Sequence, residues 1–273
     1  MSDFPRRMPK NPTLHTATVV RSERRTPSFQ RVTVGGPGLD NFQFVGMDQW
    51  FRLFIPTTPE AAVVVPEFTG RAWWQPYLDL PDQVRPHCSN YTVAEFRRTE
   101  SGAEMDIDVV LHWNAGANLC GAVAIWADQA QPGQQLALLD QGLLFDPAAD
   151  TTDHLLVADE TGLPAVRGIL RDLPEESIGR VLLEVPTEGD VEQVVAPAGM
   201  AVTWLIRRDP AATPGRLALA AIRADPSHTE TTHAFVVGES ALATGGRRAL
   251  KSAGLSTKRI YFSGFWRHDR TPE

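Results

Sequence analysis

Acidic side chains stand directly after two apolar segments in the second half of the chain. Asp159, Glu160 and Thr161 follow the segment DHLLVA, and Gly238 and Glu239 follow HAFVV. Ligands of open parallel sheets bind at the carboxyl ends of the strands, so we expect the two turns to border one ligand crevice. The alternative is purely structural: Thr161 would cap the helix that follows, and acidic groups suit its positive end.

A basic pair belongs to the same predicted edge. Arg207 and Arg208 follow the segment VTWLI, and arginine there is suited to the 2′-phosphate of NADP. The alternative is a solvated strand end. A serine-hydrolase elbow is disfavoured, because Leu242 stands where Gly would have to follow Ser240 by two positions.

Composition narrows the classes of function. The chain has 273 residues, a net charge of −7 and two cysteines without CxxC spacing, which argues against a general nucleic-acid or membrane-surface binder. The seven histidines form no HxxxH or HExxH pattern, so we expect no metal site. No uninterrupted apolar run is long enough to span a bilayer. We expect a cytoplasmic protein with reduced thiols.

The first half has the pattern of an antiparallel β-barrel. Short apolar segments separated by Pro and Gly predict strands, which are TATVVRSERR, QRVTV, QWFRLFI, YTVAEF, MDIDVVL and QLALL. A helix is expected from about Ala117 to Ala130. Residues 57–86 form a long loop, in which Trp73 and Trp74 would either pack in the core or stack on a flat ligand.

The second half alternates apolar strands with helical segments, which predicts an α/β domain with a mostly parallel sheet. Val166, Ile169, Leu170 and Leu173 follow the spacing of one buried helix face, and Pro174 ends that helix. The domain break should fall within residues 146–153. We therefore divide the chain into residues 1–148 and 149–273.

Several segments, in order along nearly the whole chain, resemble the siderophore-interacting protein family, which consists of FAD-dependent ferric-siderophore reductases within the ferredoxin-reductase-like superfamily. The strongest is ADETGLPA at residues 158–165, which is similar to the family's Gly-Asp-Glu-Thr-Ala-Leu-Pro-Ala signature. RPHCSNYTV resembles its Arg-Pro-X-X-Arg-X-Tyr-Thr-Val segment. The others are DQWFRLFI, WLIRR, VVGES and GFWR.

The resemblance implies a two-domain, ferredoxin-reductase-like fold, with an FAD-binding barrel and a domain for NADPH or NADH. It places Tyr91 on the flavin ring and Thr92 near its N5 atom. The acidic and Gly-Glu turns would flank the nicotinamide nucleotide in a redox crevice between the domains. Arg52 and Arg267 would form a basic rim for an anionic ferric siderophore, whose iron leaves as Fe(II). The remaining residues that it assigns to cofactor binding are Ser89, Asn90, Val93, His112, Gly116, Ala117 and Asn118.

The sequence departs from the family in the flavin segments. Ser89 and Ala94 stand where the family has arginines. The resemblance implies that the first of these arginines meets the FAD pyrophosphate, and the loss of two charge-assisted contacts would cost about 3–6 kcal/mol of FAD binding. Trp113 replaces a glycine, and about four extra residues precede Trp126. One alternative is therefore a repurposed relative with weakened or lost FAD, which binds a natural product or catalyses a cyclisation, with Trp113 inside the former cleft. Another is a siderophore-binding or regulatory protein without turnover.

Overall fold

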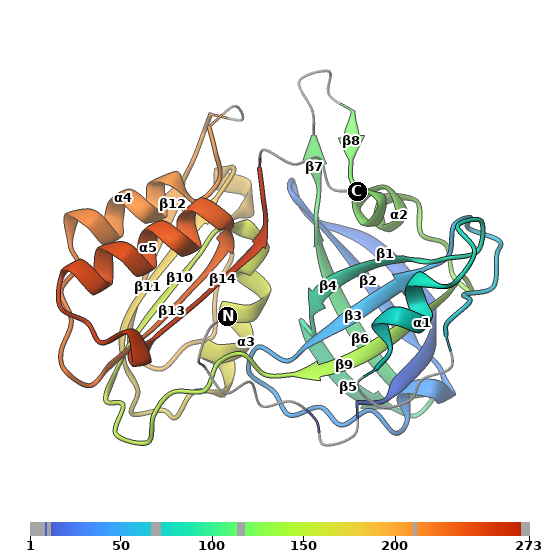
Figure 1. The fold of residues 1–273 in the computed structure, drawn as a ribbon, viewed down its shortest axis with the longest axis horizontal. Coiled ribbons are helices and arrows are strands. Elements are labelled where there is room, and N and C mark those ends of the chain that lie inside the picture. The colour runs from blue at the N-terminus through green and yellow to red at the C-terminus, as the bar shows by residue number, and fades with distance from the viewer. Residues whose placement is uncertain (1–8, 10–11, 67–71, 114–117, 210–211, 269–273) are drawn as a thin grey trace. The chain divides into compact units, whose positions relative to one another are not determined.

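The computed structural model describes residue 9 and residues 12–66, 72–113, 118–209 and 212–268. These residues form two compact units. One comprises the described residues up to Val45 together with Gln49–Leu143; the other comprises Gly46–Asp48 and the described residues from Leu144 onward. Each unit contains one main sheet, antiparallel in the first and parallel in the second, as the sequence predicts (Figure 1).

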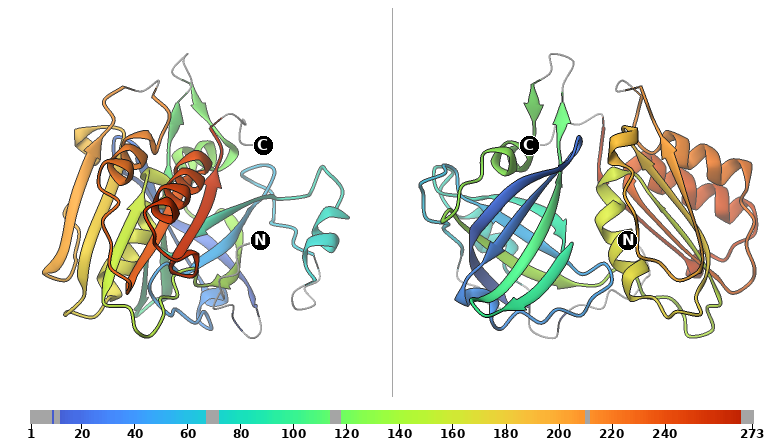
Figure 2. Two further views of the ribbon diagram at one scale, coloured as in Figure 1. Left: turned by 60° about the vertical axis from the view of Figure 1, so that its left-hand side comes forward. Right: turned by 180° about the vertical axis from the view of Figure 1, so that it is seen from behind.

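The first unit is built on a seven-stranded sheet in the order β4-β3-β9-β1-β2-β6-β5. The sheet curls so that β4 approaches β6, which gives it the form of a barrel (Figure 2). Its strands are β1 (Leu14–Thr26), β2 (Phe29–Gly35), β3 (Trp50–Ile55), β4 (His87–Thr92), β5 (Glu95–Thr99), β6 (Gly102–Val110) and β9 (Gln135–Gly142).

The corner between β4 and β5 corrects one prediction. The segment YTVAEF is not a single strand, because Val93 and Ala94 divide it. The Val93 amide donates to the Gln49 carbonyl, whereas the Ala94 amide donates to the Asp106 carbonyl. The chain thus changes its hydrogen-bonding partner from the β3 side to β6 between two buried residues, which turns the sheet.

Helix α2 closes the interior of the barrel. Val123, Ala124 and Ala127 on this helix pack into the same apolar core as Phe51 and Leu138 from the strands. The helix is shorter than predicted, because Leu119 and Cys120 pair with the preceding strand instead. The remaining elements of this unit are η1 (Pro37–Leu39), α1 (Trp74–Leu78), β7 (His112–Trp113), β8 (Leu119–Cys120) and α2 (Ala122–Gln129).

The second unit has a five-stranded parallel sheet in the order β12-β11-β10-β13-β14. Strand order reverses beside β10, which is where doubly wound folds bind ligands. The strands are β10 (Asp153–Ala158), β11 (Ile178–Val185), β12 (Gly199–Ile206), β13 (Thr232–Glu239) and β14 (Ile260–Trp266). The helices are η2 (Glu160–Gly162), α3 (Leu163–Asp172), η3 (Glu188–Asp190), α4 (Arg216–Ala224), α5 (Ser240–Ser252) and η4 (Thr257–Arg259).

Helix α3 confirms the predicted apolar face. Val166, Ile169 and Leu170 are buried, Leu173 is its C-cap, and Pro174 follows. Helices α4 and α5 pack side by side on the opposite face of the sheet from α3 (Figure 1). None of the helices in the described part of the chain is long and apolar enough to cross a membrane.

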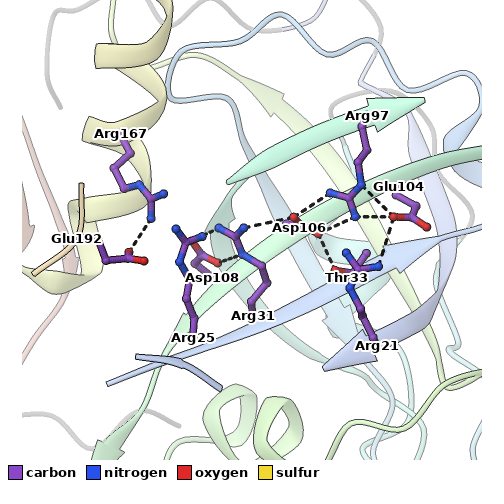
Figure 3. Close-up of polar contacts among 10 residues, drawn as sticks. All are labelled: Arg21, Arg25, Arg31, Thr33, Arg97, Glu104, Asp106, Asp108, Arg167 and Glu192. Carbon is purple, nitrogen blue, oxygen red and sulfur yellow. Dashed lines mark hydrogen bonds and ion pairs between the residues drawn. The ribbon is translucent and has the colours of Figure 1, made fainter. Parts of the chain in front are cut away.

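Ion pairs fasten the strands of the first unit to one another. Arg31 on β2 forms a two-armed pair with Asp108 on β6, at 2.7 and 2.8 Å. Arg97 on β5 binds Asp106 and Glu104 (Figure 3). Despite its burial, Asp106 keeps a pKa below the ordinary value, because hydrogen bonds from Arg97 and Thr33 and the charge of Arg31 stabilise its carboxylate.

Candidate active site

Four of the residues predicted to bind the flavin, Ser89, Asn90, Tyr91 and Thr92, lie on β4, an edge strand of the barrel sheet. Tyr91 pairs with Phe51 and Ser89 pairs with Leu53 on β3, so both point toward the interior side of the sheet, where Tyr91 packs against the core. Burial raises the pKa of the Tyr91 hydroxyl above its ordinary value, so the phenol remains protonated at neutral pH.

The neighbours of Tyr91 differ in their surroundings. Asn90 is exposed and lies across from Arg52, on the opposite face of the strand pair. Thr92 is buried and pairs with Trp50. The Val93 amide is already bonded to the Gln49 carbonyl at 2.8 Å, so Val93 has only its carbonyl to offer a ligand.

A cavity of about 540 Å³ lies beside β4 in the first unit. One wall is a face of α2, formed by Ala122, Ile125, Trp126 and Gln129. The rest of the lining comes from the end of β3 and the loop after it, from α1, from the segment that leads into β4 and from Gln134: Ile55, Pro56, Thr57, Thr58, Pro59, Tyr77, Asp82, Arg85, Pro86, His87 and Gln134. The volume lies in the range of cofactor and drug-sized ligand sites.

The second predicted flavin segment forms a two-stranded hairpin. His112 on β7 pairs with Cys120 on β8, and Asn118 is exposed beside it. Gly116 and Ala117 lie outside the described residues. Trp113 is 52% exposed.

Arg52 lies among aromatic side chains. Its guanidinium carbon is 5.0 Å from the ring centre of Trp73 and 5.7 Å from that of Trp50, an arrangement that stabilises a cation. Trp73 is buried, whereas Trp74 is exposed and stacks on Tyr77. Core packing therefore explains Trp73, and Trp74 keeps an exposed ring. Arg267, the other predicted rim residue, is exposed in the second unit.

In the second unit, the two acidic turns meet at the same edge of the sheet, as predicted. The Asp159 carboxylate accepts hydrogen bonds from the backbone amides of Thr161 at 2.9 Å and of Glu239 at 2.6 Å, and from the Thr161 hydroxyl at 2.6 Å. Complete burial, with a smaller contribution from Glu160, raises the pKa of the Asp159 carboxyl to about 7. Asp159 thus caps the 3-10 turn η2, whereas α3 begins after Gly162 without a side-chain cap, so the alternative that Thr161 caps the helix is wrong.

Gly238 permits this close approach. Its φ is +128°, and a Cβ added there would lie 2.5–2.6 Å from the Asp159 carboxylate. Any side chain would therefore separate the two turns. The next residue, Glu239, is buried and caps α5 by accepting the Ala241 amide, and it also accepts the His268 amide at 3.3 Å.

Arg207 is held by two buried carboxylates. It donates to Glu160 at 2.7 and 3.0 Å and to Glu184 at 3.0 Å, and its side chain is only 7% exposed. Glu184 also accepts the amides of Gly215 and Ala218. Arg207 thus joins the ends of β10, β11 and β12, while its neighbour Arg208 is 73% exposed and pairs with Glu188.

Sequence reasoning missed Glu184 and the cavity. A glutamate near the end of the apolar segment RVLLEV was a usable signal, because a buried acid requires a partner, and the adjacent strand ends in an arginine pair. The cavity walls come from four separate stretches of chain, so no local pattern could indicate them.

Two family descriptions match the chain. The Siderophore-interacting FAD-binding domain covers residues 18–143, and Siderophore-interacting protein covers residues 151–269. The chain belongs to the siderophore-interacting protein family. Solved ferredoxin reductases share the fold of this family member, which confirms the predicted ferredoxin-reductase-like class.

Relatives of this siderophore-interacting protein include two bacterial proteins with names that describe reductases. The ferric vibriobactin reductase ViuB of Vibrio cholerae is 29% identical, over 93% of this chain and 89% of its own. The NADPH-dependent ferric-chelate reductase of Escherichia coli is 29% identical, over 96% of both chains. A siderophore utilization protein from T. fusca has a solved structure with a TM-score of 0.79 and 27% identity, over 98% of both chains.

Proposed function

We propose that this protein is an NAD(P)H-dependent flavoprotein that reduces a ferric siderophore and releases Fe(II). The observation that carries the proposal is the position of Tyr91: it lies on the interior side of β4, in the unit that matches the FAD-binding domain of the family. The names of the two reductase relatives support the reaction class.

The residues of the barrel fit a flavin. Tyr91 offers an aromatic surface on an edge strand, and its raised pKa keeps the phenol neutral. The cavity beside α2 is large enough for part of a dinucleotide. Bound FAD would supply the redox chemistry, because it accepts a hydride from NAD(P)H and donates single electrons, so that one NAD(P)H reduces two Fe(III).

The chain's own residues have the simpler tasks of binding and positioning. Tyr91 and Thr92 would hold the flavin ring, and His112 and Asn118 would contact the cofactor from the β7–β8 hairpin. In the second unit, the Asp159 bond to the Glu239 amide would fix the two turns against the nicotinamide nucleotide. Arg52 and Arg267 would attract an anionic ferric chelate.

The former-cleft alternative is not supported. It predicted Trp113 inside the former cleft, whereas Trp113 is 52% exposed and is not among the residues that line the cavity beside α2. The FAD-binding family model and the reductase relatives favour the flavoprotein instead. The other alternative, a siderophore-binding or regulatory protein without turnover, would not reduce a ferric siderophore in the experiment described next.

The test is a flavin titration followed by anaerobic reduction. We expect the purified protein to retain FAD, NAD(P)H to bleach its visible absorbance, and a ferric siderophore to restore it with Fe(II) captured by a colorimetric chelator. Tyr91→Ser should weaken flavin retention, whereas Ile178→Ser, an exposed change in the other unit, should not. Failure to bind flavin, or binding without bleaching by either nucleotide, would overturn the proposal.

A further inference from the structure

Ser89 occupies the position at which the family has an arginine, and it is not alone there. Its hydroxyl lies 2.8 Å from Nε2 of His87. The two residues alternate along β4 and pair with Leu53 and Ile55, so both face the interior side of the sheet, like Tyr91.

His87 also lines the cavity beside α2. The other titratable or charged residues of its lining are Tyr77, Asp82 and Arg85. Tyr77 donates to the Pro86 carbonyl, and Arg85 binds Asp82 and the carbonyls of Leu78 and Leu80. These three side chains are therefore engaged with one another or with the backbone.

Charges on the neighbouring elements are directed elsewhere. Asp128 on α2 forms an ion pair with Arg24 at 2.7 Å. Arg52 on β3 lies across from Asn90 on the opposite face of the strand pair, over the indoles of Trp50 and Trp73. His87 is thus a cavity residue whose side-chain bond, to Ser89 two positions along β4, can be rearranged to meet a ligand.

Whether Nε2 of His87 carries a proton decides what Ser89 can donate. When Nε2 carries no proton, the Ser89 hydroxyl is occupied as the donor to the ring. When the ring is protonated, Nε2–H donates to Oγ, and the hydroxyl proton becomes available to an anion. Burial lowers the pKa of His87 below its ordinary value, so the ring is neutral at pH 7 unless an anion stabilises its charged form.

We propose that His87 and Ser89 together replace the missing arginine at the diphosphate of FAD, so that FAD binding takes up a proton and tightens as the pH falls. This inference rests on the proposed flavoprotein function. The sign follows from linkage: a bound diphosphate raises the pKa of His87, and the dissociation constant therefore increases with pH between the free and bound pKa values.

The test is the dissociation constant of FAD, measured by fluorescence between about pH 5.5 and about pH 8.5 at constant ionic strength. We expect an increase of roughly tenfold across this range, which corresponds to the lower end of one charge-assisted contact. His87→Gln should bind at the weak, high-pH level throughout. Ser89→Arg should bind tightly with little pH dependence. Riboflavin, which lacks the diphosphate, should show no pH dependence with the wild-type protein.

Two controls separate the possible failures. His228→Gln replaces a half-buried histidine of the other unit and should keep the full pH dependence. NMR titration of labelled histidine should show the pKa of His87 rising when FAD binds, which does not depend on any variant folding. An equal pH dependence in His87→Gln, or an unchanged pKa, would overturn the inference and leave the flavoprotein intact. Absence of FAD binding at every pH would overturn the proposed function itself.

Discussion

The Cβ of Ala158 lies 2.8 Å from the position that a Cβ on Gly162 would take, and Cγ2 of Val237 lies 2.7 Å from it. The space between β10, η2 and β13 therefore holds one methyl group rather than two. The family signature has glycine first and alanine second, whereas this chain has alanine first and glycine second. The two departures compensate each other.

Exchanging both residues should leave the free energy of unfolding nearly unchanged, although each single change should lower it. Gly162→Ala should destabilise the protein by about 1–3 kcal/mol through overpacking, since φ at Gly162 is −90° and imposes no backbone strain. Combining it with Ala158→Gly should recover most of that loss, which urea unfolding of the four proteins would measure as a coupling energy. Additive effects would show that the two positions do not share the space.

Replacing Arg207 should lower the free energy of unfolding far more than replacing Arg208. Arg207→Ala leaves Glu160 and Glu184 buried without their partner, and such losses cost about 3–5 kcal/mol. Arg208→Ala breaks only an exposed pair with Glu188 and should stay within about 0.5 kcal/mol. Urea unfolding of both variants measures the contrast. Equal effects would mean that the buried contacts do not hold the strand ends together.

His233 should make the protein sensitive to acid. Burial lowers its pKa to about 4, with smaller contributions from the charges of His154 and Arg259. Its unfolded form takes up a proton near pH 6.5, so stability falls as the pH decreases from about 6.5 to about 4, by roughly 3 kcal/mol at the limit.

Urea midpoints between about pH 7.5 and about pH 4.5 would measure this loss. In His233→Leu the urea midpoint should depend much less on pH in this range, because leucine takes up no proton when the protein unfolds. His228→Gln, at a histidine outside the buried pair of β10 and β13, should leave the pH dependence unchanged. If His233→Leu loses as much stability in acid as the wild-type protein does, groups other than His233 cause the loss.

Arg267 should assist the docking of an anionic ferric chelate if the proposed reaction is right. Arg267→Gln should raise KM for such a chelate by roughly two- to tenfold and leave kcat nearly unchanged, and the difference should shrink as salt screens the charge. Arg216→Gln, an exposed change on α4, is the matched control. A fall in kcat with constant KM would argue against a docking role.

The sequence was most informative where periodicity and burial agree. The apolar face of α3 and the five strands of the parallel sheet followed from local patterns, and the register of β10 with β13 brings Asp159 and Glu239 together. The sequence predicted less about residues whose roles depend on groups from distant parts of the chain. The roles of Asp159 and Arg207 depend on carboxylates and amides from other elements, and the β4–β5 corner depends on the partners that Val93 and Ala94 find across the sheet.

The two faces of helix α2 have different surroundings. Val123, Ala124 and Ala127 belong to the apolar core, whereas Ala122, Ile125 and Gln129 line the cavity. Substitutions on the cavity side can therefore reshape a ligand site without opening the core. The lining of the cavity can thus change one residue at a time while the barrel core stays intact.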